Sequence, residues 1–284
     1  MAILCRHRDF RFIKAPFIGA FISLIFYGVS CVQTFFYFQT YPDDHVSLKC
    51  LVAVIWILET AHSGFAISWN NHYLIDRFGE IDALDLIAWD FVVDCEIGFF
   101  ITLLVNLLFI WRVWAFSKKV WPVCILLFLE ISRYIMSTVT TSLAFHVYVN
   151  WGTFKDHAYV ALAVTMGVAA LADSLIASIL AYYLHSKRTQ RSTRLITHLL
   201  AYIVGTGALT SILSILQLIT ITTSPNSLLF VPFSLIQIKI YANAALLSLN
   251  LRQYQRKPRH SVTFPNFDSD STPDNSNTSL TPKF

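Results

Sequence analysis

The sequence predicts an all-α protein, a seven-transmembrane-helix bundle that forms a single domain. Apolar residues make up 55% of the 284 residues and charged residues only 13%, about half the charged share of a soluble domain. The apolar residues also fall into blocks close to the ~20 residues with which a helix crosses a bilayer. Short links that contain basic or turn residues separate these blocks, so the expected surroundings are a lipid bilayer.

The expected spans follow one another along the chain as residues 15–41, 46–69, 84–111, 121–147, 159–185, 195–221 and 227–250. A basic segment, residues 1–14, precedes the first block, which is too long for the apolar region of a cleaved signal peptide. The membrane domain therefore covers residues 15–255. Residues 256–284 are rich in Ser, Thr, Pro and Asn with little to bury, and predict a disordered tail.

The Lys and Arg residues beside the spans predict an orientation, because cytoplasmic links of membrane proteins are enriched in positive charge. After the first span, the outer segments hold only Arg77 and Lys155 if the N-terminus is outside. The inner segments then hold Lys49, Arg112, Lys118, Lys119, Lys187, Arg188, Arg191, Arg194, Arg252, Arg256, Lys257 and Arg259. The four basic residues of segment 1–14 point the other way. We expect an outer N-terminus and a cytoplasmic C-terminus, with the plasma membrane as the best assignment.

Five charged residues lie inside apolar blocks, where an unpaired charge is costly. Counting from the basic end of each span at ~1.5 Å per residue gives depths of roughly 15 to 21 Å, so all five fall in one slab near the bilayer centre. They are Asp173, Lys239, Glu59, Glu130 and Arg133. With His62 and Asn243 they form a candidate polar network, which is either a binding or relay site or a structural network that fixes helix packing.

We expect Asp173 and Lys239 to face each other, directly or through one side chain such as Asn243. Glu59 and Glu130 are competing partners for Lys239, since they lie at a similar depth. Lys239 and Asn243 are four residues apart and therefore share one helix face.

A second acidic group lies in the outer third of the third expected helix, around residues 84–96. Asp90 and Asp94 share a helix face there. They indicate either an acidic outer mouth that attracts cations or a solvated extension of the helix.

The sequence argues against several classes of site. The five cysteines are scattered without metal-ligand spacing. Haem ligation requires paired histidines at matching depths, whereas His62 is deep but alone. A retinal lysine is disfavoured, because the position one turn before Lys239 is Leu235 rather than an acid. No catalytic, cofactor or metal site is therefore predicted, and the net charge of +4 is too small to indicate nucleic acid.

A set of short motifs nevertheless resembles a large family of seven-helix fungal membrane proteins, abundant in mushroom-forming fungi and known only as a domain of unknown function. The resemblance covers roughly residues 15–255 and is strongest over 171–252. The motifs are Tyr41-Pro42-Asp43-Asp44, Leu58-Glu59-Thr60-Ala61-His62, Arg112-Val113-Trp114, Ala172-Asp173-Ser174, Gly207-Ala208-Leu209-Thr210-Ser211 and Lys239-Ile240-Tyr241-Ala242-Asn243. Glu130 and Arg133 are not part of the pattern. The resemblance implies a fold and a membrane location, but no activity.

Two functions remain open at this point. Helix number, the outer N-terminus and the Ser/Thr-rich tail favour a receptor- or sensor-like protein that binds an unknown small ligand or protein partner. The charged slab and the acidic mouth favour a small-solute or cation transporter or channel instead, although no internal repeat of the kind many carriers show is present. An enzyme is not expected.

Overall fold

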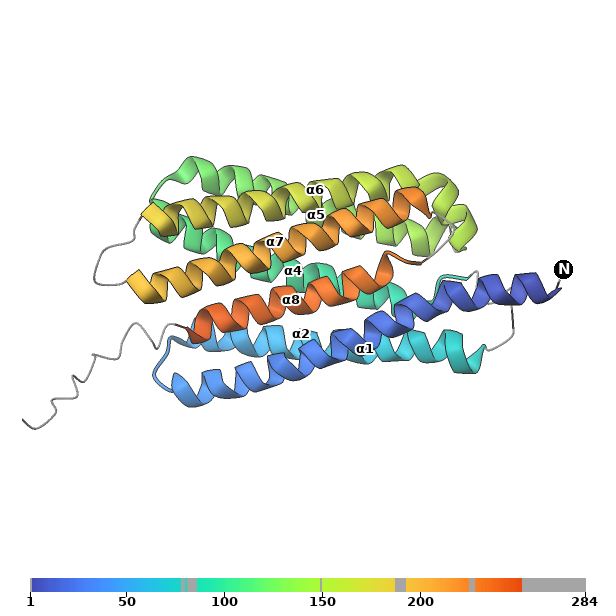
Figure 1. Cartoon of the computed structure of the whole chain (residues 1–284), viewed down its shortest axis with the longest axis horizontal. Coiled ribbons are helices and arrows are strands. Elements are labelled where there is room, and N and C mark those ends of the chain that lie inside the picture. Colours follow the sequence, from blue (N-terminus) through green and yellow to red (C-terminus); the bar gives the residue numbers. More distant parts are fainter. Residues whose placement is uncertain are drawn as a thin grey trace, which may run out of the picture.

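The computed structural model describes residues 2–77, 80, 86–148, 150–186, 193–224 and 228–251, and within this part seven long α-helices run along one common direction (Figure 1). They are α1 (Ala2–Thr40), α2 (Val46–Asn71), α4 (Trp89–Ser117), α5 (Val120–Leu143), α6 (Trp151–Ser186), α7 (Thr193–Thr223) and α8 (Val231–Asn250). Two π-helical turns, η1 (His72–Asp76) and η2 (Ala144–Tyr148), continue α2 and α5. Each of the seven contains a stretch long and apolar enough to cross a membrane, which confirms the all-α bundle.

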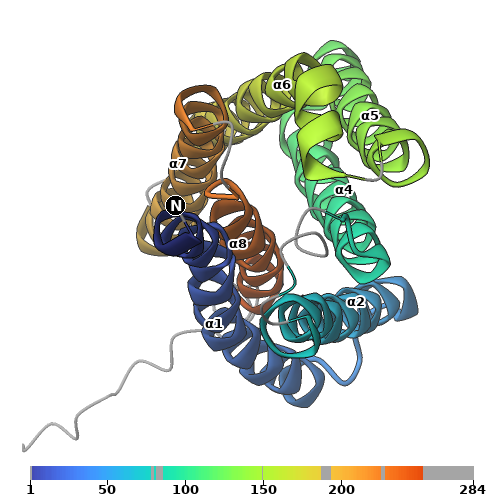
Figure 2. The same cartoon turned by 90° about the vertical axis from the view of Figure 1, so that its right-hand side faces the viewer.

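The last helix, α8, is the centre of the bundle, and the other α-helices surround it (Figure 2). Of the most apolar stretch of α8, 72% is buried, against 50% for α4 and 22–33% for the other five helices. Small residues allow neighbouring backbones to approach α8 closely. A Cβ atom added to Gly19 of α1 would overlap Pro232 at the start of α8.

Two apolar clusters fill the two ends of the bundle. The first cluster contains Tyr37, Ile55, Val105, Leu180 and Leu246. The second contains Trp69, Tyr73, Trp151, Phe154 and Leu235, at the end where α6 and α8 begin. Buried polar and charged side chains, among them Glu59, His62, Glu130, Asp173, Gln237 and Lys239, lie between the clusters. We call this level of the bundle the polar layer.

The third span begins later than the sequence predicted, at Trp89 instead of residue 84. Leu86 forms an isolated antiparallel bridge with Asn150, so its backbone is extended. The Tyr73 hydroxyl donates to the Leu86 carbonyl at 2.7 Å and accepts from the Ala88 amide at 2.9 Å. These tertiary contacts hold the segment before Trp89 outside the helix. Residues 81–85, including Asp85, lie outside the described residues.

The first helix is longer than expected, because α1 begins at Ala2 and includes the basic N-terminal segment. Two other predicted segments fall outside the described residues. They are the basic link at 187–192 and the tail at 256–284.

Candidate functional site

Helix α8 presents polar side chains on two opposite faces. At 3.6 residues per turn, residues two positions apart point about 200° apart around the helix. Lys239 and Asn243 therefore share one face, while Gln237 and Tyr241 share the opposite one. The first face packs against α1 and α2, and the second against α5, α6 and α7, which divides the polar layer into two groups.

The first group is built around Lys239, whose side chain is fully buried. Its Nζ lies 3.4 Å from Glu59 Oε2 and donates to the Glu59 carbonyl at 3.1 Å and to Ser63 Oγ at 2.8 Å. The Glu59 side chain is fully buried as well. A buried ion pair is stabilising only where further hydrogen bonds satisfy its remaining groups. The Glu59 carbonyl and Ser63 provide such bonds for the Lys239 ammonium.

Helix α1 and Asn243 enclose this ion pair. Ser30 donates to Glu59 Oε2 at 3.5 Å, and the Lys239 ammonium lies 5.4 Å from the centre of the Tyr27 ring. Asn243 Nδ2 donates to the Phe26 carbonyl of α1 at 3.0 Å and to the Lys239 carbonyl at 2.9 Å. Asn243 thus ties α8 to α1 and does not bridge Lys239 to Asp173.

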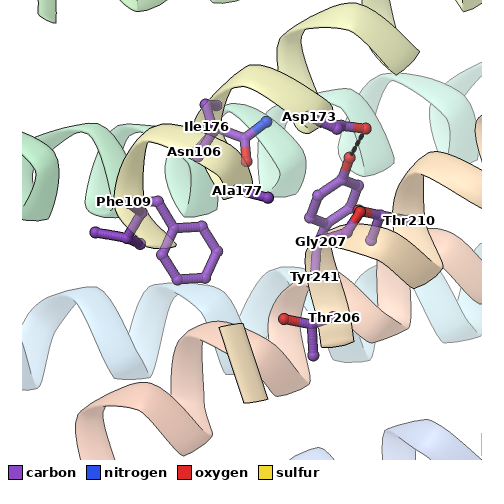
Figure 3. A pocket seen from close by; sticks show the side chains of 10 residues that line it. Asn106, Phe109, Asp173, Ile176, Ala177, Thr206, Gly207, Thr210 and Tyr241 are labelled. Atoms are coloured by element: carbon purple, nitrogen blue, oxygen red, sulfur yellow. Dashed lines mark hydrogen bonds between the residues drawn. The ribbon is translucent and has the colours of Figure 1, made fainter. Parts of the chain in front are cut away.

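The second group is built around Asp173 of α6. Arg133 of α5 lies 3.1 Å from Asp173 Oδ1 and 3.7 Å from Glu130 Oε1. The Tyr241 hydroxyl donates to Asp173 Oδ2 (Figure 3). The Arg133 guanidinium also lies over the Tyr241 ring, 5.8 Å from its centre. One arginine therefore shares its charge between two acids and an aromatic face.

Gln237 connects this group to α7. Gln217 Nε2 donates to its Oε1 at 2.5 Å. The Gln237 amide nitrogen lies 2.8 Å from Ser214 Oγ, 3.3 Å from the Thr210 carbonyl and 3.5 Å from Asp173 Oδ2. An amide has two N–H donors, so these acceptors outnumber the hydrogen atoms that it can offer.

The predicted pair of Asp173 and Lys239 is wrong. Lys239 pairs with Glu59, and Asp173 pairs with Arg133. Asp173 lies on the side of α8 that Tyr241 faces, and Lys239 points the other way, towards α2.

A small cavity of about 30 Å³ adjoins Asp173 and Tyr241 (Figure 3). Asn106 and Phe109 of α4 line it together with Ala177 of α6 and Gly207 of α7. A volume of this size holds about one water molecule.

A larger cavity of about 80 Å³ lies on the side of the polar layer that holds the second apolar cluster. Five aromatic residues line it, together with aliphatic residues of α8 and α6. The aromatic residues are Phe91, Phe99, Trp151, Phe154 and Phe230. We call it the aromatic cavity.

His62 and Asp94 are the polar residues that line the aromatic cavity at the polar layer. His62 Nε2 lies 3.6 Å from Asp94 Oδ1, and both side chains are at most 3% exposed. Trp69 Nε1 donates to Asp94 Oδ2 at 2.9 Å. Within the described part of the chain, Asp94 Oδ1 and both ring nitrogens of His62 have no hydrogen-bond partner. Buried polar atoms are normally paired, and two of these three, His62 Nε2 and Asp94 Oδ1, lie next to each other.

Asp90 lies one helical turn before Asp94 and is 4% exposed. Ser68 donates to its Oδ2 at 2.8 Å, and its Oδ1 accepts from the amide of Phe91. The structure thus brings both aspartates of the predicted acidic mouth against α2 and buries them. Of the two, only Asp94 lines the aromatic cavity.

Sequence reasoning missed Gln237, Tyr241 and Trp69. A usable signal existed for two of them, because Gln237 and Tyr241 repeat the four-residue spacing of Lys239 and Asn243 on the other face of α8. Trp69 gave no such signal, since a tryptophan in an apolar span is ordinary. Among the described residues, no cluster of three or more His, Cys, Asp or Glu side chains could hold a metal ion.

Comparison with known proteins bears on the last part of the chain. Residues 169–254 match a family of unknown function, DUF6534. The matched segment includes Asp173, Gln237 and Lys239, whereas Glu59, Asp94 and Arg133 precede it. No curated protein and no solved structure matches the chain. The protein is therefore a multi-pass membrane protein, and its last three helices, from residue 169, match a family of unknown function.

Proposed function

We propose that this protein is a receptor- or sensor-like membrane protein that binds a small ligand in the aromatic cavity. The observation that carries the proposal is the combination of an apolar cavity of about 80 Å³ with unpaired polar atoms of His62 and Asp94 in its wall. Small-molecule sites are typically apolar with a few polar groups that fix the ligand's orientation.

The position of the cavity favours sensing over transport. The polar layer borders it on one side, and the ion pair of Lys239 and Glu59 in that layer is completely buried. The first apolar cluster fills the bundle beyond this layer. A solute in the cavity would have to disrupt this pair and the cluster in order to cross, which would cost several kcal/mol.

The cavity wall also connects mechanically to the centre of the bundle. On α2, Glu59 and Ser63 accept hydrogen bonds from Lys239. His62 lies three residues after Glu59 and directly before Ser63. A ligand that moves His62 would therefore shift the contacts between α2 and α8. This connection supports a response to binding that reaches the central helix.

The proposal includes an orientation and a membrane. The distribution of Lys and Arg supports an outer N-terminus and a cytoplasmic C-terminus, with the plasma membrane as the location. The aromatic cavity would then face the outside. The resemblance over residues 15–255 supports a fungal source and the seven-helix family described above.

A thermal-shift experiment tests ligand binding. The purified protein is heated with propanol, butanol, propylamine or butylamine, because a ligand that binds the native state raises the melting temperature. We expect at least one compound to stabilise the wild type but not Ser234→Phe, which places a ring in the cavity. Ala208→Phe on the exposed face of α7 is the matched control and should respond like the wild type.

Two outcomes would contradict the proposal. The first is that none of the four compounds changes the melting temperature. The second is that a stabilising compound acts equally on Ser234→Phe, because its binding site would then lie elsewhere.

A further inference from the structure

We propose that the ligand of the aromatic cavity is a small primary amine, bound as its ammonium ion between Asp94, His62 and the aromatic wall. This inference names the ligand class of the site and therefore rests on the proposed function. Three features of the site carry it: the balance of charge around Asp94, the arrangement of hydrogen-bond acceptors and the aromatic lining.

Among the described residues of the polar layer, no lysine or arginine forms a direct ion pair with Asp94. Lys239 is paired with Glu59 at 3.4 Å, and Arg133 is shared by Asp173 and Glu130 at 3.1 and 3.7 Å. Asp94 receives one hydrogen bond, from the uncharged indole of Trp69. A buried carboxylate needs a positive partner to remain ionised. A ligand ammonium would supply this direct partner.

The two acceptor atoms, His62 Nε2 and Asp94 Oδ1, favour a ligand group that carries more than one N–H or O–H hydrogen. The 3.6 Å separation between His62 Nε2 and Asp94 Oδ1 exceeds the 2.7–3.2 Å usual for an N–H···O bond. With the imidazole proton on Nδ1, Nε2 is an acceptor beside the carboxylate oxygen. A primary ammonium carries three N–H groups and can donate to both atoms at once, whereas an alcohol has one hydrogen to donate.

The aromatic lining suits a cation as well. Phe91, Phe99 and Trp151 are among the five rings around the cavity. The faces of aromatic rings attract ammonium groups, and the attraction grows where water is excluded. Phe91 and Trp151 pack edge to face with centroids 5.2 Å apart, which fixes their orientation. A carboxylate ligand, by contrast, would be repelled by Asp94.

The cavity volume limits the size of the amine. About 80 Å³ is roughly half of the ~150 Å³ cavity that accepts a benzene molecule in an engineered protein. The enclosed part of the ligand is therefore the ammonium group with the first carbon atoms of an alkyl chain. Butylamine serves as the probe because its chain is narrower than a ring.

The test compares butylamine with butanol, which has the same chain but no charge. Binding is measured by isothermal titration to the full chain in lipid nanodiscs, with empty nanodiscs as the blank for partitioning into lipid. We expect the wild type to bind butylamine about tenfold more tightly than butanol, because the ammonium adds a charge-assisted hydrogen bond and ring contacts. Asp94→Asn should lose this preference while it still binds butanol.

Asp90→Asn is the matched control, since Asp90 lies on the same helix but does not line the cavity, and it should keep the preference. Phe99→Leu provides a second test that leaves every acid in place. It should weaken butylamine binding more than butanol binding, because it removes a ring from the wall without removing a hydrogen-bond acceptor.

The outcomes separate this inference from the proposed function. Equal binding of amine and alcohol by the wild type would overturn the amine assignment and leave the cavity as a ligand site. Undiminished amine preference in Asp94→Asn, or in Phe99→Leu, would also overturn it. Binding of neither probe would overturn both the amine assignment and the ligand site.

Discussion

Lys239 and Arg133 bring positive charge to the polar layer, and each pairs with a different set of acids. Lys239 pairs with Glu59 of α2. Arg133 of α5 pairs with Asp173 of α6 and with Glu130 of its own helix. The two groups lie on opposite faces of α8, so the loss of one partner cannot be compensated by the other group. A charge left alone in the buried bundle is costly, and these pairs are therefore expected to be strongly coupled.

A double-mutant cycle tests the pair of Glu59 and Lys239. Glu59→Gln and Lys239→Met should each lower the free energy of unfolding by about 3–5 kcal/mol, because each leaves a buried charge unpaired. The double mutant should recover much of that loss. Unfolding of the reconstituted protein by a denaturing detergent provides the measurement.

Asp173→Asn combined with Lys239→Met is the matched comparison. Since these residues belong to different groups, their effects should add. A coupling between Asp173 and Lys239 as large as that between Glu59 and Lys239 would mean that the pairing described above is wrong.

The sequence predicted the depth of these residues better than their partners. Counting from basic helix ends suggested that five charges share one level, and the structure brings them together around α8 in two groups. Depth follows from residue number alone. Partner choice depends on which helix faces which side of α8, and this depends on packing between segments far apart in the sequence. Asp173 and Lys239 were therefore paired incorrectly.

At the scale of elements, the central position of α8 agrees with a feature of its sequence, its low mean hydropathy. Its mean hydropathy is 1.2, the lowest of the seven spans, against 2.0 for α4 and α6. A helix that faces lipid needs an apolar surface, whereas a helix surrounded by protein can carry Gln237, Lys239 and Asn243 if each finds a partner. The spans could be predicted from apolar block length. The late start of α4 could not, because it depends on contacts with Tyr73 and Asn150.

The contact between α6 and α7 depends on Gly207. A Cβ atom added there would overlap the Cβ of Ala177, whereas one added at Gly205 would have no neighbour within 4 Å. Gly207→Ala should therefore destabilise the protein by about 1–3 kcal/mol through overpacking. Gly205→Ala should be neutral or stabilising by up to about 1 kcal/mol, because alanine is the better helix former.

The same detergent unfolding measurement compares the two glycine variants. If they have equal stability, the close approach of α6 and α7 at Gly207 is not a determinant of the fold. The comparison is informative because the two positions lie on the same helix and differ only in what the added methyl group meets.

At the scale of the whole molecule, the proposed orientation rests on the distribution of positive charges. Asp76→Cys, beyond α2, and Lys119→Cys, between α4 and α5, place thiols at opposite ends of the bundle in exposed positions. In a background without other cysteines, we expect an impermeant thiol reagent to label residue 76 but not residue 119 on intact cells. Labelling of residue 119 alone would reverse the orientation.

The central claim is that the aromatic cavity opens to one face of the membrane only, as a sensor requires. Ser234 lines the cavity, and Ser234→Cys provides a reporter once the native cysteines, including Cys95 in the same wall, have been replaced. The rate of reaction with an impermeant thiol reagent is measured in sealed vesicles of both orientations. We predict reaction from the face that carries Asp76 and protection from the face that carries Lys119. Reaction from both faces would contradict the account and indicate a transport pathway instead.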